Sequence, residues 1–487
     1  MKFLSITGLL GPLACTLLAC GAVADVAPQK DQPVAVEQAP ARPIETDAGV
    51  STPPPPTECS PPLVDPKCGT TKPAPTTTTT IASFVKKSAV PLRCDAAGNA
   101  DVWDVRPLVQ LYGKQKMFMM GEVHGTNEIG IMSSLVFEQL ASQKLVNVVA
   151  FEMPMDLEPA LQRYLDTGKD PMAQQIIQHG SPNMFGTILT KTARALVVKG
   201  IPLRIGAVDI PYDPQTAVHA IQEVATKLTV QKNAVLATLP TSNAEPPGPA
   251  DIAAANTYFD HIMANKSTIC SELSVADCDR LVAMTHALWA STLSGDRGDD
   301  QLWFARREEV IYYNLRTKMA APTDRMFLHM GAFHTNKGAA SAGSRMAHEY
   351  ALTKDQVFSV APAYGDGSVI WYGEDMDLPG APGTIVSALS HVPAHPFFVS
   401  TTRPSASCES NPLGEEPEDS VGGGTRGELY DGYIHYGKLT SEQRPEDTTF
   451  TLDSELGGGK GNGKPAIRSL GDFRLRIQQR EQRAFAH

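Results

Sequence analysis

The amino-acid sequence predicts an α/β protein in which helices flank a mostly parallel β-sheet. Short apolar runs of strand length alternate along the chain with longer segments of helical periodicity, an order typical of parallel strands joined by crossover helices. The run 146–151 is almost continuously apolar, as in a strand buried on both faces. A long helical stretch in the middle predicts a helical insertion, and the polar segments at both ends predict disordered termini.

We expect one α/β domain over residues 88–376. Its elements follow from the helical and strand periodicities, and Gly200 marks the end of one helix. The last two strands are expected to pair with each other. Strand-like runs lie at 116–120, 146–151, 201–208, 325–330, 357–361 and 368–372, and helical segments lie at 128–143, 157–166, 185–198, 214–239, 251–263, 275–293, 302–318 and 341–350.

The N-terminus has the features of a bacterial lipoprotein signal. Lys2 precedes an apolar stretch that is interrupted by glycines and by Pro12, too short for a membrane-spanning helix. The stretch ends in Leu-Leu-Ala-Cys at 17–20, which resembles the lipobox of bacterial lipoproteins. We therefore expect residues 1–19 to be removed as a signal peptide and Cys20 to be lipidated, which would anchor an exported protein to the outer or inner membrane of the cell envelope. A plain signal peptide is the alternative.

Two further segments are expected to lie outside the folded domain. Residues 20–87 are rich in proline and threonine, and such a segment buries too little apolar surface to fold, so it should form a disordered tether. Residues 377–487 are rich in glycine and acidic residues and are expected to be mostly irregular, with a short helix near 469–483.

The net charge of the chain limits the classes of partner that it can bind. The 487-residue chain carries 53 acidic and 42 basic residues, a formal net charge of −11. That balance opposes binding to phosphate backbones, so nucleic acid is not expected as a partner. A small-molecule substrate is expected instead.

Six of the eight cysteines would remain after cleavage and lipidation, in a compartment where disulfides can form. Closeness in sequence suggests Cys59 with Cys68 and Cys270 with Cys278, and Cys94 with Cys408 could tie the ends of the domain. Six cysteines allow about 15 connectivities, so the pairing stays open.

Polar side chains follow four of the expected strands at the same end. Glu122 and His124 follow the first, Glu152 ends the second and Asp209 the third, and His334 follows the fourth. The carboxyl ends of parallel strands meet at one edge of a sheet, where ligands bind. We therefore expect these acids and imidazoles to share one pocket.

Such a set of residues supports two chemistries. An imidazole with a pKa near neutrality can take a proton from water while a neighbouring carboxylate orients it, as in a hydrolase. Alternatively, Glu122, His124, Glu152 and His334 could bind a divalent metal, which would then acidify the water. The residues alone leave both open.

The motifs resemble those of erythromycin esterase-like proteins. Gly-Glu-Val-His-Gly-Thr-Asn-Glu at 121–128 is similar to a glycine-Glu-His-glycine signature with a trailing Glu, and 148–152 is similar to the next strand, which also ends in Glu. Arg307 with Asn314 resembles an Arg-Asp motif followed by Asn. Residues 328–334 and 340–371 resemble the family's late strand with its His and its C-terminal helix and hairpin.

The resemblance implies a role for each matched residue. It implies that His124 is the general base for attack of water on an ester or lactone. Glu122, Glu152 and His334 would be supporting or metal-binding groups, and Arg307 a partner of an oxyanion or carboxylate. Glu128, Asp209 and Asn314 are further candidates for binding.

Two features depart from the esterase pattern. One residue separates Glu122 from His124 where the esterases carry two, and Glu308 replaces the Asp of the Arg-Asp motif. The shorter spacing is similar to that of the ChaN-type haem-binding lipoproteins and the TraB/Tiki metal-dependent proteases. A haem- or iron-binding lipoprotein and a metal-dependent peptidase are therefore the alternatives, with haem or a divalent metal as the cofactor that each implies.

Overall fold

The computed structural model describes residues 80–442, with gaps at 97–98, 114, 180–185, 212–213, 241–247, 293–299, 339, 372–373, 379–391, 393–395, 403–410 and 418–423. The signal peptide, Cys20, nearly all of the tether and the helix expected near 469–483 fall outside the described residues. The statements below concern the described residues alone.

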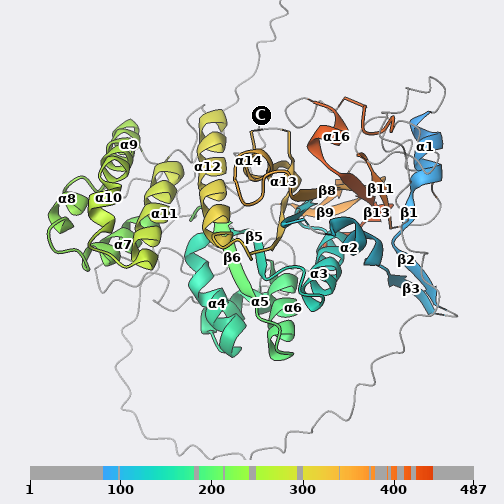
Figure 1. The fold of residues 1–487 in the computed structure, drawn as a ribbon, viewed down its shortest axis with the longest axis horizontal. Helices are drawn as coiled ribbons and strands as arrows, with labels where there is room; N and C mark the ends of the chain where they lie inside the picture. Colours follow the sequence, from blue (N-terminus) through green and yellow to red (C-terminus); the bar gives the residue numbers. More distant parts are fainter. Residues whose placement is uncertain are drawn as a thin grey trace, which may run out of the picture. The chain divides into compact units, whose positions relative to one another are not determined.

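An eight-stranded sheet forms the centre of the fold (Figure 1). Its strand order is β1-β11-β12-β8-β4-β7-β5-β6. Every neighbouring pair from β12 to β6 is parallel, whereas β1 with β11 and β11 with β12 are antiparallel. The predicted α/β class with a mostly parallel sheet is confirmed. The strands are β1 (Val90–Pro91), β4 (Met117–Glu122), β5 (Val148–Pro154), β6 (Arg204–Asp209), β7 (Met326–Gly331), β8 (Val357–Ala363), β11 (Phe397–Ser400) and β12 (Gly432–His435).

Apolar side chains cover both faces of the central strands. On one face Phe118 and Phe327 pack with tilted rings whose centres are 5.6 Å apart, and both belong to the larger core. On the other face Met119 and Leu328 pack in a second core together with Ile311. Parallel strands buried on both faces need apolar residues at nearly every position, which is why the sequence shows runs rather than alternation.

Helices flank this sheet (Figure 1). The helices predicted at 128–143, 157–166, 185–198, 302–318 and 341–350 are present with shifts of a few residues at their ends, and three short helices that were not predicted, at 106–112, 171–179 and 332–335, flank the sheet with them. They are α2 (Arg106–Tyr112), α3 (Asn127–Ser142), α4 (Glu158–Thr167), α5 (Pro171–His179), α6 (Thr187–Val198), α12 (Asp300–Lys318), α13 (Ala332–Thr335) and α14 (Ala342–His348), with the 3-10 turn η1 (Met155–Leu157) before α4.

The helical insertion has its own core, which includes Ile221, Tyr258 and Leu281. The single helix expected over 214–239 is two helices. The chain turns between them because the Glu272 carboxylate accepts hydrogen bonds from the backbone N–H groups of residues 229–231. Its helices are α7 (Pro214–Ala225), α8 (Lys232–Ala237), α9 (Pro249–Ala264), α10 (Lys266–Cys270) and α11 (Val275–Ser291).

One of the suggested disulfides lies in this insertion. Cys270 at the end of α10 is bonded to Cys278 in α11. The other two suggested pairings involve cysteines whose side chains fall outside the described residues.

The sheet extends beyond the expected domain boundaries. Strands β11 and β12 come from the segment 377–487, which the sequence indicated to be mostly irregular, and α1 (Ile81–Ser88) lies within the expected tether. Each of these strands has only four residues, too few to show a periodicity.

The expected closing pair of strands is also divided between two sheets. Strand β8 lies in the central sheet, whereas β9 (Asp366–Trp371) pairs with β10 (Glu374–Leu378) and β13 (Lys438–Leu439). A further hairpin joins β2 (Arg93–Ala96) to β3 (Asn99–Trp103), and α16 (Arg426–Leu429) precedes β12. Among the described helices, none has both the length and the apolar character needed to cross a lipid bilayer.

Candidate active site

The carboxyl ends of β4, β5, β6 and β7 meet at one edge of the central sheet. Glu122 is the last residue of β4, Glu152 lies near the end of β5, and Asp209 ends β6. His124 follows β4 directly, and His334 lies in α13, the short helix that begins where β7 ends. Parallel order delivers all five side chains to the same edge, as expected from the sequence.

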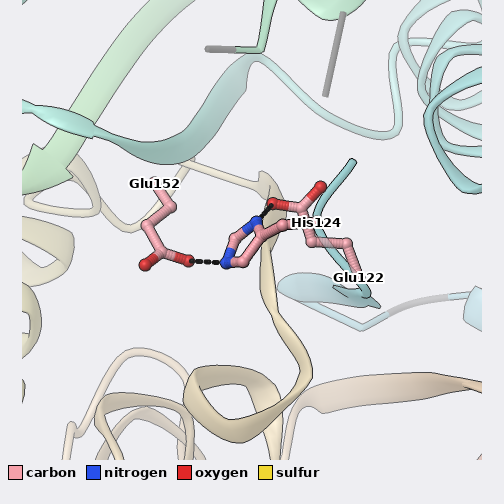
Figure 2. Close-up of side chains that lie close together, drawn as sticks. All are labelled: Glu122, His124 and Glu152. Carbon is pink, nitrogen blue, oxygen red and sulfur yellow. Dashed lines mark ion pairs between the residues drawn. The ribbon is translucent and has the colours of Figure 1, made fainter. Parts of the chain in front are cut away.

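Glu122 and His124 form the first pair of the site (Figure 2). His124 Nδ1 lies 2.8 Å from Glu122 Oε1, and the Glu122 side chain is 2% exposed. The chain turns away immediately afterwards at Gly125, whose φ of 78° is accessible to glycine at little cost. The opposite ring nitrogen, His124 Nε2, faces Glu152 Oε2 at 3.7 Å.

A second imidazole lies on the other side of Glu122. His329 in β7 places Nε2 2.7 Å from Glu122 Oε2. Burial would raise the pKa of Glu122, but the imidazoles of His329 and His124 outweigh this effect and hold the pKa at about 2. Glu122 is therefore an anion at neutral pH.

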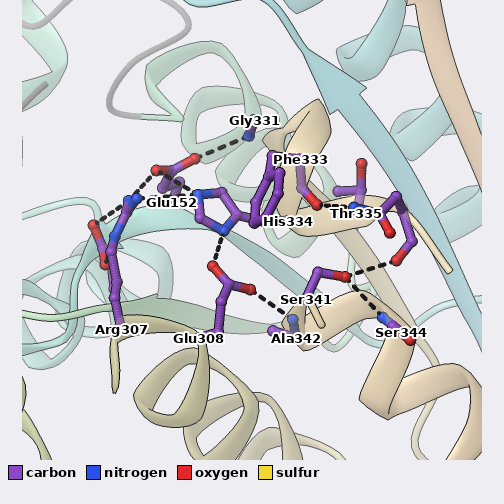
Figure 3. A network of polar contacts seen from close by, with 12 residues as sticks. Glu152, Arg307, Glu308, Gly331, Phe333, His334, Thr335, Ser341, Ala342 and Ser344 are labelled. Atoms are coloured by element: carbon purple, nitrogen blue, oxygen red, sulfur yellow. Dashed lines mark hydrogen bonds and ion pairs between the residues drawn. The ribbon is translucent and has the colours of Figure 1, made fainter. Parts of the chain in front are cut away.

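Glu152 is the centre of the polar network (Figure 3). Its Oε2 accepts a hydrogen bond of 2.9 Å from the backbone N–H of Gly331. Its Oε1 is paired with the Arg307 guanidinium and lies 3.4 Å from His334 Nε2. Burial opposes ionisation, but His334 and Arg307 keep the pKa of Glu152 well below its usual range.

Arg307 on α12 joins two of the strand ends. Its Nε and Nη2 donate to both oxygens of Asp209 at 2.9 and 3.0 Å, and Nη2 also donates to Glu152. Its Nη1 lies 3.1 Å from His334 Nε2. Burial disfavours the charged form, but Asp209 and Glu152 raise the pKa of Arg307 further above its usual range. The carboxylate partners implied for Arg307 are thus side chains of the protein itself.

His334 is held by Glu308, the next residue on α12. His334 Nδ1 contacts Glu308 Oε1, and Glu308 Oε2 accepts from the backbone N–H of Ala342 at 2.6 Å (Figure 3). Burial lowers the pKa of His334, but Glu308 and Glu152 outweigh burial and the charge of Arg307, and they raise the pKa to about 9. The two carboxylates therefore favour the protonated form of His334.

Gly331 lies next to His124, Glu152 and His334. A Cβ atom at this position would lie 3.3 Å from both His124 Nε2 and Glu152 Oε2, and 3.5 Å from His334 Cδ2. Its φ of −45° is ordinary for any residue. A side chain at this position would therefore crowd both the His124 imidazole and the Glu152 carboxylate.

Three side chains could hold a metal ion. Glu122, His124 and Glu152 each offer one ligand atom, and these atoms lie within 4.8 Å of one another. The fit is partial, because Glu122 contacts Nδ1 of His124 while Glu152 faces Nε2. An ion bound at Nε2 would have Glu122 behind the imidazole, as in carboxylate–histidine–metal arrangements. His334 is outside this group because its Nε2 faces the Arg307 cation.

Solved structures share this fold at low sequence identity. A Bacillus cereus protein matches with a TM-score of 0.59 at 16% identity, over 76% of this chain and 100% of its own. A succinoglycan biosynthesis protein matches with a TM-score of 0.55 at 15% identity, over 76% and 99%. A mutant of the erythromycin esterase EreC in its open conformation matches with a TM-score of 0.52 at 12% identity, over 70% and 96%.

This chain has the erythromycin esterase fold. The resemblance that the motifs indicated is therefore confirmed for the fold. No protein-family model matches the chain, and no curated protein matches it significantly.

Two residues expected to bind a ligand have structural contacts within the esterase-like fold. Glu128 accepts hydrogen bonds from the backbone and hydroxyl of Thr440, which ties the segment after β13 to the start of α3. Asn314 donates to the carbonyl of Val208 at 2.9 Å and thereby holds α12 against β6.

Sequence reasoning missed His329 and gave Glu308 no role of its own. His329 is 1% exposed in the middle of an otherwise apolar strand, where a histidine without a partner would be costly. This buried histidine among apolar residues was the feature of the sequence that could have identified His329 as part of the site. Glu308 lies in a mixed charge run at 306–309, which on its own is typical of a solvated helix face.

Proposed function

We propose that this protein is a hydrolase that cleaves a carboxylic ester or lactone with His124 as the general base. One observation carries the proposal. His124 turns Nδ1 toward the buried Glu122 anion and Nε2 toward Glu152, next to Gly331, where the chain carries no side chain. A carboxylate that accepts a hydrogen bond from one ring nitrogen orients the imidazole and puts the lone pair on the other nitrogen, which can then accept a proton.

The reaction follows from this geometry. A water molecule next to His124 Nε2 loses a proton to that nitrogen while its oxygen forms a bond to the carbonyl carbon. The tetrahedral intermediate then breaks its C–O bond to the leaving group, and the His124 imidazolium returns the proton to the departing alcohol. Glu122 stabilises the imidazolium between these two steps.

The charges of the site favour an uncharged substrate. Four carboxylates, the buried Glu122, Asp209 and Glu308 and the 10% exposed Glu152, lie around Arg307 and His334. Arg307 and His334 are both paired with these carboxylates. Little positive charge is left over for a phosphate or free carboxylate, whereas a neutral ester meets no such opposition.

The test is hydrolysis of a panel of p-nitrophenyl esters and lactones by the purified protein. We expect His124→Gln to lower kcat by roughly 100- to 10,000-fold, the usual contribution of a general base. His219→Gln on α7, outside the site, is the matched control and should hydrolyse at the wild-type rate. Equal rates for the His124 and His219 variants would sink the proposal.

Gly331→Ala tests whether the position beside His124 Nε2 and Glu152 Oε2 must stay without a side chain. The methyl group would lie 3.3 Å from both His124 Nε2 and Glu152 Oε2, at a backbone conformation that alanine adopts without strain. We expect hydrolysis to fall by about 10-fold or more, because misplacing a reactant by about 1 Å can cost about 100-fold, while the melting temperature stays near that of wild type. Full activity with the methyl group present would contradict the assigned position of the attacking water.

A metal-dependent hydrolase is the second candidate. The ligand atoms of Glu122, His124 and Glu152 favour it because they lie within 4.8 Å of one another. A bound divalent ion would supply an acidified water beside the same three side chains. Metal analysis of the purified protein, followed by hydrolysis assays with and without chelator, separates the candidates: chelator leaves the rate unchanged if His124 alone is the base. Haem binding stays a prediction, which addition of haem and a Soret spectrum would test.

We further propose that the protein acts at the bacterial cell envelope, anchored through a lipidated Cys20, on a small-molecule substrate. The Leu-Leu-Ala-Cys sequence at 17–20 supports the anchor, and the net charge of −11 opposes a nucleic-acid partner.

A further inference from the structure

We infer that His329 and Ser133 are positioning residues that hold Glu122, and through it His124, in the orientation the base requires. The kinetic part of this inference rests on the proposed hydrolase function, whereas the structural part does not. Neither residue reaches the reacting atoms, so both act through Glu122.

The contacts form a continuous chain from the core to the site. Ser133 Oγ on α3 lies 3.0 Å from His329 Nδ1, and His329 Nε2 lies 2.7 Å from Glu122 Oε2. Glu122 Oε1 in turn lies 2.8 Å from His124 Nδ1. Ser133, His329 and Glu122 are 0%, 1% and 4% exposed, whereas the His124 side chain is 14% exposed. The chain of contacts therefore runs from fully buried groups to the one partly open imidazole.

The hydrogen-bonding capacity of each group determines where the protons lie. A carboxylate only accepts, so the two short contacts of Glu122 assign a proton to the imidazole nitrogen that lies within 3 Å of each of its oxygens. His329 then has its proton on Nε2, and its Nδ1 accepts the hydroxyl proton of Ser133. His124 has its proton on Nδ1, which leaves a lone pair on Nε2, the nitrogen that faces Glu152.

Loss of His329 would leave Glu122 Oε2 buried without its partner. An unsatisfied buried carboxylate oxygen is costly, so the carboxylate is expected to rotate toward any other donor and to release the His124 ring. The register brings His329 opposite Met120 on β4 and Phe151 on β5, so this effect does not require movement of the sheet.

The kinetic test compares two substitutions at position 329 with p-nitrophenyl acetate as the probe. His329→Phe keeps the ring volume and removes the donor, and we expect kcat to fall roughly 10- to 100-fold, as when the outer partner of a functional histidine is lost. KM should stay within about 2-fold because His329 does not touch the substrate. His329→Gln, whose amide N–H can replace Nε2–H, should restore kcat to within about 5-fold of wild type.

A matched control separates positioning from loss of packing. His286→Phe removes another buried imidazole, which lies on α11 between Tyr313 and Phe259, outside the chain of contacts. It should leave kcat unchanged. If both phenylalanine variants lose activity equally, or if His329→Gln is as impaired as His329→Phe, the positioning role is refuted.

The second measurement needs no hydrolytic activity. Nitrogen-15 NMR of histidine-labelled protein reports which ring nitrogen of His124 carries the proton, and the signal is assigned by its absence in His124→Gln. We expect an Nδ1–H tautomer in wild type and a mixture of tautomers in His329→Phe. An Nε2–H tautomer in wild type, or an unchanged spectrum in His329→Phe, overturns the inference even if hydrolysis is never observed.

Ser133→Ala keeps the test decisive if His329→Phe fails to fold. Removal of the hydroxyl leaves His329 Nδ1 without a donor but spares the core packing. We expect a partial shift of the His124 tautomer and a loss in kcat of about 3-fold, the scale of a single neutral hydrogen bond. A spectrum and a rate identical to wild type would remove Ser133, and with it the proposed chain, from the site.

Discussion

Arg307 shows how single side chains hold the site together. Its guanidinium pairs with Asp209 at the end of β6 and with Glu152 at the end of β5. The planar fork of arginine matches two carboxylates at once, a geometry that lysine cannot reproduce. Arg307 therefore fixes the positions of two strand ends and of the carboxylate that faces the base.

We expect Arg307→Met to destabilise the protein by about 3–5 kcal/mol, because it leaves two buried carboxylates without their cation. Urea unfolding at pH 7 measures the change. Arg163→Met is the matched control, since Arg163 is 57% exposed and forms a single ion pair of 2.9 Å with Asp170, a kind of pair worth at most about 1 kcal/mol. Similar losses in the two variants would show that the Arg307 network contributes no more than a surface pair.

At the level of elements, the helical insertion contains a buried histidine that makes its stability depend on pH. His286 on α11 is 5% exposed, stacks on Tyr313 at 4.7 Å and meets Phe259 edge-on at 5.0 Å. Burial, with a smaller effect from Lys266, lowers its pKa from 6.5 to about 4. The ring is therefore neutral in the folded insertion at pH values where the unfolded chain would already be protonated.

The direction in which stability changes with pH follows from this depressed pKa. The stability associated with His286 is fully present above pH 6.5 and is lost as the pH falls toward 4, up to about 3 kcal/mol. We expect His286→Phe to abolish this loss. The free energy of unfolding of the variant should therefore increase relative to that of wild type as the pH falls. Urea unfolding at pH 7.5 and pH 4.5, followed by tryptophan fluorescence, measures the difference. An equal decrease in both proteins would contradict the assignment.

The sequence pattern predicted some helices and strands of this chain better than others. Strands β4, β5, β6 and β7 were found because burial on both faces leaves a long apolar run. The break between α7 and α8 was missed because its cause, the Glu272 carboxylate, lies about 40 residues away in the chain. Periodicity registers local spacing and carries no information about such a distant hydrogen bond.

For the molecule as a whole, the expected anchor is tested by localisation. We expect Cys20→Ser to move the protein from the membrane fraction to the soluble fraction, because a lipid anchor needs the thiol of that cysteine. Cys15→Ser, within the same expected signal peptide, is the matched control and should remain with the membrane. If both variants stay in the membrane fraction after a carbonate wash, the lipobox assignment is wrong.

Local patterns in the amino acids were enough to predict the α/β class, the esterase-like fold and the strand ends at which Glu122, His124, Glu152 and His334 lie. These follow from local periodicity and from the rule that parallel strands end at one edge. Only the tertiary structure decided which atoms meet: that His329 and Ser133 stand behind Glu122, that Glu308 holds His334, and that Arg307 is paired within the protein. Hydrogen bonds and charge pairing act over a few ångströms between segments far apart in the chain, and no one-dimensional pattern records those distances.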